Sequence, residues 1–189
     1  MNNTAIYNDG NILYKFSPEP FMTTIRMRDV LFNFTSKAYK IMEATDAEIQ
    51  IANITILLKE HNPLISMISI TDSHFSLNNL TLLGESISSL INSMDSNLTI
   101  SGFFAKDLIV NLEKMAFITT QTKFIKTFVR EIRLERVFLD NITFVCVSPE
   151  IGSSFLQMSE GNLTNFYLSG VSFNRIVASI LHKIKIFFY

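Results

Sequence analysis

The chain has 189 residues, which is long enough for one domain with a substantial core. Apolar residues make up 48% of it and charged residues only 17%, a composition that argues against intrinsic disorder. The formal net charge of −1 leaves no broad basic surface of the kind that binds nucleic acid or an anionic membrane.

The first 24 residues precede the repetitive part of the chain and are expected to form a lead-in or a partial rung. The stretch from Met1 to Gly10 is polar and lacks the basic end and apolar run of a signal peptide. Residues 25–182 are expected to form one repetitive domain, followed by a truncated or partial rung at 183–189. Because the segment from Ile184 to Tyr189 is largely apolar and β-prone, we expect the chain to be part of a longer protein.

Six octads, segments of eight residues, align without gaps. They are residues 25–32, 49–56, 75–82, 98–105, 132–139 and 166–173. The first, third, sixth and eighth positions of each octad are apolar, so a strand-like alternation slips by one residue after the fifth position. Such a slip predicts a corner that keeps the apolar side chains inside.

The fifth position of the octad favours residues that tolerate a left-handed backbone. Its six occupants are Asp29, Asn53, Asn79, Gly102, Arg136 and Gly170. Arg136 departs from this preference, and its rung is expected to bend differently. The first octad positions should stack as one buried column, made of Ile25, Ile49, Phe75, Leu98, Ile132 and Phe166.

A looser apolar element follows each octad. Its six copies are residues 41–42, 64–67, 90–94, 116–119, 155–158 and 179–181. We expect these copies to form a further strand in each rung, with Met42, Met67, Met94 and Met158 stacked as a column of core residues. Two insertions, around 119–130 and 146–152, are expected to be loops on one face, where solenoids place specific contacts.

The predicted fold is all-β, a single right-handed parallel β-helix solenoid of about six rungs. The octads at 75–82 and 98–105 resemble most closely the generic rung of the pectin-lyase-like superfamily. This resemblance covers most of residues 25–182 and concerns the rungs, not an active site. The texture is also similar to the long, repetitive β-helix surface proteins of single-celled eukaryotes. A leucine-rich repeat has a similar period but needs Asn three residues after the third position of the octad. The sixth octad position is apolar in all six copies, beginning with Val30 and Ile54, so a leucine-rich repeat is rejected.

Pectin-lyase-like enzymes, as the resemblance implies, carry acidic clusters or groups of Asp and Arg on the outward strand column that faces the sugar groove. The residues expected in that column here contain no acid. They are Ser66, Asn92, Ser93, Thr119, Gln157 and Ser159. Asp107 and Asp140, placed similarly in neighbouring rungs, are interpreted as turn-capping residues, not as a catalytic pair. We therefore predict no catalytic residue, no cofactor and no metal site.

The remaining polar groups favour structural interpretations. His61, His74 and His182 share no metal-ligand spacing, and Cys146 is expected to be a small buried residue. A basic run with acids among it indicates a solvated face. It contains Lys123, Lys126, Arg130, Glu131, Arg133, Glu135 and Arg136.

The Asn-x-Thr sequons suggest a glycosylated surface protein. Beyond one at Asn2, the candidate sites are Asn33, Asn53, Asn79, Asn97, Asn141 and Asn162. The alternative is that the rung itself creates some of these sequons, because Asn53 and Asn79 occupy the corner.

The first function hypothesis is a non-catalytic structural or binding segment of a larger extracellular or membrane-anchored protein. Its partners would be a carbohydrate or a protein at the longer loops, and further rungs stacked end to end, with no nucleic acid. The rival hypothesis is a remnant of a carbohydrate-active β-helix enzyme, a polysaccharide lyase or hydrolase. A non-functional gene fragment is the third possibility.

Overall fold

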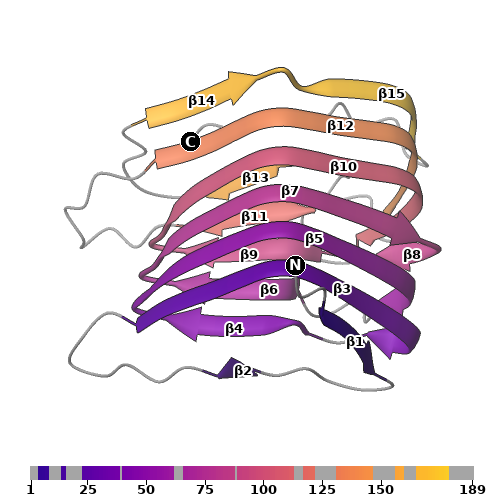
Figure 1. Cartoon of the computed structure of the whole chain (residues 1–189). Helices are drawn as coiled ribbons and strands as arrows, with labels where there is room; N and C mark the ends of the chain where they lie inside the picture. Colours follow the sequence, from indigo (N-terminus) through magenta and orange to yellow (C-terminus); the bar gives the residue numbers. More distant parts are fainter. Residues whose placement is uncertain are drawn as a thin grey trace.

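The chain winds into an all-β parallel solenoid with two sheets and no helix among the described residues (Figure 1). The computed structural model describes residues 4–8, 14–15, 23–38, 40–61, 66–87, 89–112, 117–121, 131–146, 156–159 and 165–178. The prediction of an all-β parallel solenoid is confirmed.

The first sheet contains nine strands, of which five are long and four are short. They are β1 (Thr4–Asn8), β3 (Thr23–Ala38), β5 (Ala47–His61), β7 (His74–Gly84), β8 (Ser86–Ile87), β10 (Asn97–Leu112), β12 (Glu131–Cys146), β14 (Asn165–Ser169) and β15 (Ser172–Ala178). Its strands stack in the order β1-β3-β5-β7-β10-β12-β14, and every pair is parallel. The octads therefore pair in sequence order along the solenoid axis.

The second sheet contains shorter strands and lies behind the first in Figure 1. They are β2 (Tyr14–Lys15), β4 (Met42–Thr45), β6 (Ser66–Thr71), β9 (Ser89–Met94), β11 (Ile118–Gln121) and β13 (Leu156–Ser159). Five of the six predicted second elements overlap these strands, with shifted ends. The sixth, at 179–181, lies outside the described residues.

The solenoid has about three turns, not the six expected. Turns described through both sheets cover residues 40–61, 66–87 and 89–112, with short gaps between them. Counting octads counts strands of the first sheet, whereas a turn needs a path through both sheets. For the outer octads, the segments that connect the two sheets lie outside the described residues.

The corner within each octad is left-handed in all six copies. The φ angles run from 53° at Arg136 to 70° at Gly102, with Asn53 at 54° and Asn79 at 57°. The expectation that the Arg136 rung bends differently is wrong. Neighbouring strands are paired on both sides of this corner, so the register imposes the conformation on Arg136 although it costs an L-residue about 1–2 kcal/mol.

A second corner, missing from the sequence prediction, has positive φ at Asp107, Asn141 and Arg175. A third corner joins the two sheets and has positive φ at Asp46, Asp72 and Asp95, each three residues before its octad. Aspartate suits these positions because its short polar side chain tolerates the left-handed region.

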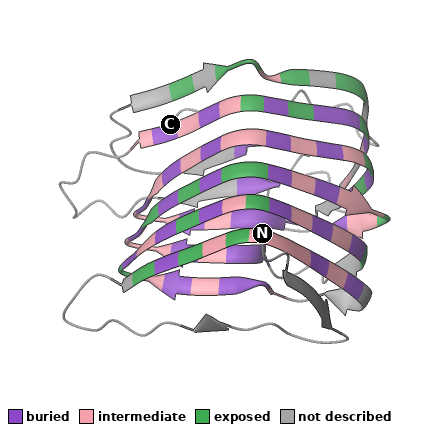
Figure 2. Cartoon of the chain, viewed as in Figure 1, coloured by how far each residue is buried: buried purple, intermediate pink, exposed green. Residues whose placement is uncertain are grey.

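The core fills the space between the two sheets. The predicted column that begins with Ile25 and Ile49 pairs in register through every octad, and its first five members are at most 8% exposed. Buried and outward residues alternate along the strands of the first sheet (Figure 2). Burial of this apolar column is the main force that holds the rungs in register.

Candidate functional site

The outer face of the first sheet, on the stretch before the octad corner, is polar. One outward column there contains Arg26, Gln50, Ser76, Thr99, Arg133 and Tyr167. The next contains Arg28, Ala52, Asn78, Ser101, Glu135 and Ser169. We call this surface the polar face. It is the outward half of the same alternation that buries the octad column.

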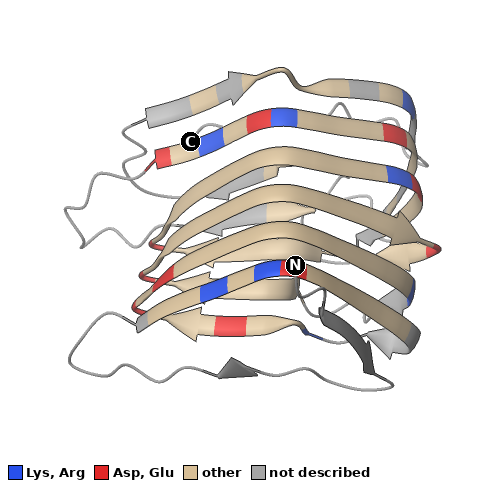
Figure 3. Ribbon diagram, in the orientation of Figure 1, with Lys and Arg blue, Asp and Glu red and all other residues tan. Residues whose placement is uncertain are grey.

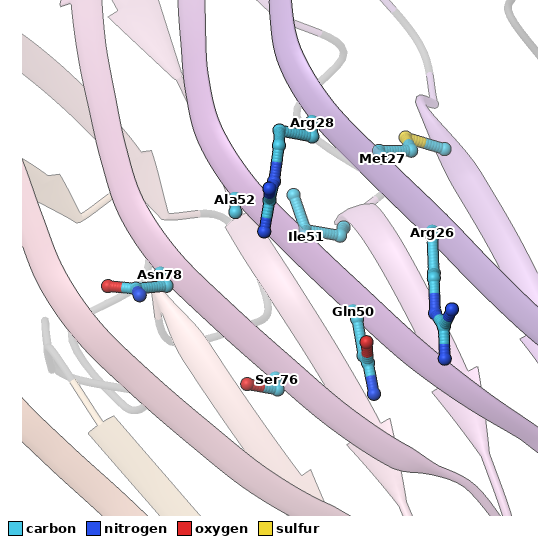
Figure 4. A pocket seen from close by; sticks show the side chains of 8 residues that line it. All are labelled: Arg26, Met27, Arg28, Gln50, Ile51, Ala52, Ser76 and Asn78. Atoms are coloured by element: carbon cyan, nitrogen blue, oxygen red, sulfur yellow. The ribbon is translucent and has the colours of Figure 1, made fainter.

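The polar face is hollowed over β3, β5 and β7, in a depression of about 430 Å³. Its lining residues are Arg26, Met27, Arg28, Gln50, Ile51, Ala52, Ser76 and Asn78 (Figure 4). Two cations stand on β3, and hydrogen-bonding side chains follow on β5 and β7. This depression is called the β3–β7 hollow.

The two arginines of the β3–β7 hollow are exposed and make no hydrogen bond or ion pair with any residue that the structure describes. The nearby acids on this face have other partners. Glu48 accepts a hydrogen bond from Gln50 Nε2 at 2.7 Å, and Asp29 accepts one from Asn53 Nδ2 at 2.8 Å. Arg26 and Arg28 therefore keep their full donor capacity toward solvent.

Arg133 lies in the same column as Arg26 but in a different electrostatic setting. Its Nε donates to Glu131 at 2.9 Å, its guanidinium donates to Glu135 at 3.1 Å, and it stacks 4.5 Å from the centre of the Tyr167 ring. The hydrogen bonds that Arg133 donates, first to Glu131 and then to Glu135, raise the pKa of Arg133. Figure 3 shows charged residues on the first halves of β3, β5 and β12, and the uncharged first halves of β7 and β10 lie between β5 and β12.

This ion-paired arrangement agrees with the solvated-face interpretation of Arg133, Glu131 and Glu135. Arg136 donates to the Ser101 hydroxyl at 2.7 Å. Lys123, Lys126 and Arg130 lie outside the described residues, as do residues 122–130 and 147–152 of the predicted contact loops.

The second corner carries a hydrogen-bonded charge network. Asp140, whose side chain is 11% exposed, accepts two short hydrogen bonds from Arg175 at 2.6 and 2.7 Å and one from Asn174 at 3.0 Å. The hydrogen bond from Arg175 is the main cause that lowers the pKa of Asp140. Asp107 accepts from Asn141 at 2.7 Å.

The predicted equivalence of Asp107 and Asp140 is wrong by one position. Lys106 is the residue that pairs with Asp140, so Asp107 lies opposite Asn141. A catalytic carboxylate pair needs one group with a raised pKa to act as the acid. Asp140 is held in the opposite state, as an ionised hydrogen-bond acceptor.

The outward column of the second sheet also differs from the prediction. Ser66 and Ser93 are 3% and 0% exposed and lie inside, and the outward residue beside Ser69 and Asn92 in the same column is an acid, Glu43. Glu43 pairs with Lys40 at 3.0 Å. In a short strand with polar residues on both sides, the sequence does not show which side chains point into the core.

The predicted methionine column does not exist. Met42 pairs with Ile68, Met94 with Thr71, and Met158 with Thr120, so these residues stand at different positions across the sheet. Met67 is buried next to Ile68, one position earlier. The prediction failed because the copies of the second element contain no corner residue by which they could be aligned with one another.

The candidate sequons fall on residues with structural contacts. The amides of Asn53 and Asn141 donate along the corners, and Asn79 Nδ2 donates to Asn53 Oδ1 at 3.1 Å. Asn97 Nδ2 lies 2.9 Å from His74 Nδ1, and its Oδ1 accepts from the Glu131 N–H. Asn33 is half-buried.

Some predicted residues lie outside the part that the structure describes. Asn162, His182 and the side chains of His61 and Cys146 are among them. In the described residues, no three His, Cys, Asp or Glu side chains are grouped to hold a metal ion. None of the described segments is a helix long and apolar enough to cross a membrane.

Comparisons of the chain with protein-family models, with curated proteins and with solved structures give no match. The class that the fold defines is therefore a parallel β-solenoid protein. Its outer surface combines ion-paired corners with the open arginine pair of the β3–β7 hollow. Sequence reasoning missed that pair, although Arg26 and Arg28 occupy the two outward positions of their octad and no acid fills those positions in the next two octads.

Proposed function

We propose that this chain is a non-catalytic structural and binding segment of a larger surface or membrane-associated protein. The observation that carries the proposal is the side-chain ladder along the octad corner, in which Asn79 donates to Asn53 and Asn53 donates to Asp29. These residues are 24 and 26 positions apart in sequence. Polar side chains used to join successive rungs stiffen a scaffold and leave fewer groups for chemistry.

The handedness of the solenoid and its relation to known β-helix families are part of the same proposal. We infer a right-handed solenoid of pectin-lyase-like type, because parallel strands joined by a crossover in one sheet take the right-handed path in nearly all proteins. The similarity in texture to repetitive surface proteins of single-celled eukaryotes supports an extracellular setting. Among the sequons in the described residues, Asn33 would be the one most available to a glycan, because its amide makes no hydrogen bond there.

The rival function, a remnant of a carbohydrate-active enzyme, is favoured by one observation. The β3–β7 hollow lies on the face of a parallel sheet and is lined by amide, hydroxyl and guanidinium groups, which suit sugar hydroxyls. Asp140 and Asp107 argue against it, since both accept hydrogen bonds from side chains of the next rung.

An activity screen separates the two functions. The full chain is incubated with neutral and acidic polysaccharides, and both new reducing ends and unsaturated products are measured. A scaffold releases neither. Product formation that disappears in Asp140→Asn or Asp107→Asn would establish the enzyme and contradict the scaffold.

A further inference from the structure

We propose that the β3–β7 hollow binds the phosphate group of a phosphorylated, hydroxyl-rich small molecule or glycan. The hollow has an unbalanced positive charge, because two arginines line it. Arg26 and Arg28 stand two residues apart on the same side of β3, about 7 Å from one another along the strand. Neither is paired with a described residue, so the hollow carries two local positive charges.

The comparison with Arg133 shows that this lack of pairing is a local property and not a general feature of the polar face. Arg133 has a glutamate two residues before it and another two residues after it, and both accept its hydrogen bonds. At the positions beside Arg26 and Arg28, the next two strands present Gln50, Ala52, Ser76 and Asn78. The column is therefore neutralised at β12 and cationic at β3.

The charge indicates the ligand class. One guanidinium fork is enough for a carboxylate, whereas a phosphate monoester carries about −1.5 to −2 charges at pH 7 and offers three acceptor oxygens. Two arginines that form no ion pair match that charge, because the nearby Glu48 and Asp29 accept hydrogen bonds from Gln50 and Asn53 instead. Arginine also binds phosphate oxygens with well-directed paired N–H donors.

The size of the hollow indicates the rest of the ligand. It spans three neighbouring strands, which are about 4.8 Å apart, and has a volume of about 430 Å³. A phosphate group at Arg26 and Arg28 leaves the part over β5 and β7 open. Gln50, Ser76 and Asn78 line that part and offer both donors and acceptors, which suit alcohol hydroxyls.

The test uses the full chain and three probes, glucose 6-phosphate, inorganic phosphate and glucose, titrated calorimetrically at low salt. We expect glucose 6-phosphate to bind most tightly and to weaken as salt rises. Arg26→Gln and Arg28→Gln should each lower its affinity about tenfold, the loss of one charge-assisted contact. Equal affinity for inorganic phosphate would contradict the hydroxyl-binding part of the proposal.

Two further variants make the test specific. Arg133→Gln removes a cation from the same column outside the hollow and should leave affinity unchanged. Ala52→Glu keeps both arginines but adds a carboxylate beside Arg28, and it should abolish binding. All four side chains lie on the outer face, so each variant should keep the folded state, checked by circular dichroism, with a small loss of stability allowed for Arg133→Gln because it breaks two exposed ion pairs. Absence of binding in the wild type, or an equal loss in Arg133→Gln, would overturn the proposal.

Discussion

The side-chain amide of Asn53 donates from Nδ2 to the carboxylate of Asp29, 24 residues earlier in the chain, at 2.8 Å. Both residues have left-handed backbones, with φ near 54° and 57°. Asn53 therefore has two tasks at its corner: it adopts the left-handed turn, and its side chain bonds to the neighbouring rung. Asn79 extends this ladder by one rung to Asn53.

Substitutions at Asn53 should separate these two tasks. Asn53→Gly keeps the left-handed corner and loses the ladder, and we expect a loss of about 1 kcal/mol in the free energy of unfolding. Asn53→Ala loses both and should cost about 2–3 kcal/mol. Urea denaturation of the full chain measures the difference.

Thr55→Val is the control for the sequon at Asn53. It removes the sequon but keeps the Asn53 amide, so stability should stay within about 0.5 kcal/mol of wild type. If Thr55→Val lost as much as Asn53→Ala, the corner amide would not be the stabilising group.

Two glycines differ in what surrounds them, although both have positive φ. A Cβ at Gly84 would collide with the backbone carbonyl oxygen of Leu58, whereas a Cβ at Gly170 would meet the Arg136 backbone at 3.5 Å, an ordinary contact. Gly170→Ala should cost about 1–2 kcal/mol from its backbone conformation alone. Gly84→Ala should cost more because its strand must also move, and equal melting temperatures would contradict this packing.

The buried positions of the third octad are apolar. Leu77 is 1% exposed in the buried third octad position, and its neighbour Ser76 points outward. Leu77→Asp should destabilise the solenoid by several kcal/mol, because the carboxylate has no partner there. Ser76→Asp should be nearly neutral in the same urea titration, and a neutral Leu77→Asp would place Leu77 outside the core.

The Asp140–Arg175 pair predicts a pH dependence. Arg175 holds the pKa of Asp140 below its ordinary value, so the pair stabilises the fold above about pH 4. This contribution is lost as the pH falls through the lowered pKa of the folded state. The stability difference between wild type and Asp140→Asn should therefore be largest near neutral pH and shrink in acid. A difference that does not change with pH would contradict the ion pair.

The register of the first sheet could be predicted from the sequence because each octad contains a corner residue at a fixed position, by which the octads can be aligned. The left-handed residue after a fixed alternation, as at Asn53 or Gly102, sets both the corner and the facing of the side chains. The Asp at the third corner had a usable signal, since Asp46, Asp72 and Asp95 each precede an octad by three residues.

The second sheet could not be predicted in the same detail. Its strands are short, and Ser93 lies in an inward column with Ala44 and Ile70, where its hydroxyl has no hydrogen-bond partner in the described structure. Polarity therefore does not separate inside from outside there. The arginine pair of the hollow was missed for another reason. The arginine pair is unneutralised only because no acid lies beside it on β5 or β7, and those neighbours are known only once the strand register is known.

The octads stack as adjacent parallel strands in one register. Disulfide formation between engineered cysteines, with Cys146 replaced by serine, tests this stacking. Thr55 and Thr81 are register partners on outward positions of β5 and β7, so Thr55→Cys with Thr81→Cys should cross-link on mild oxidation. Thr55→Cys with Leu83→Cys is displaced by two residues, about 8 Å apart, and should remain reduced. Cross-linking of the displaced pair alone would contradict the solenoid described here.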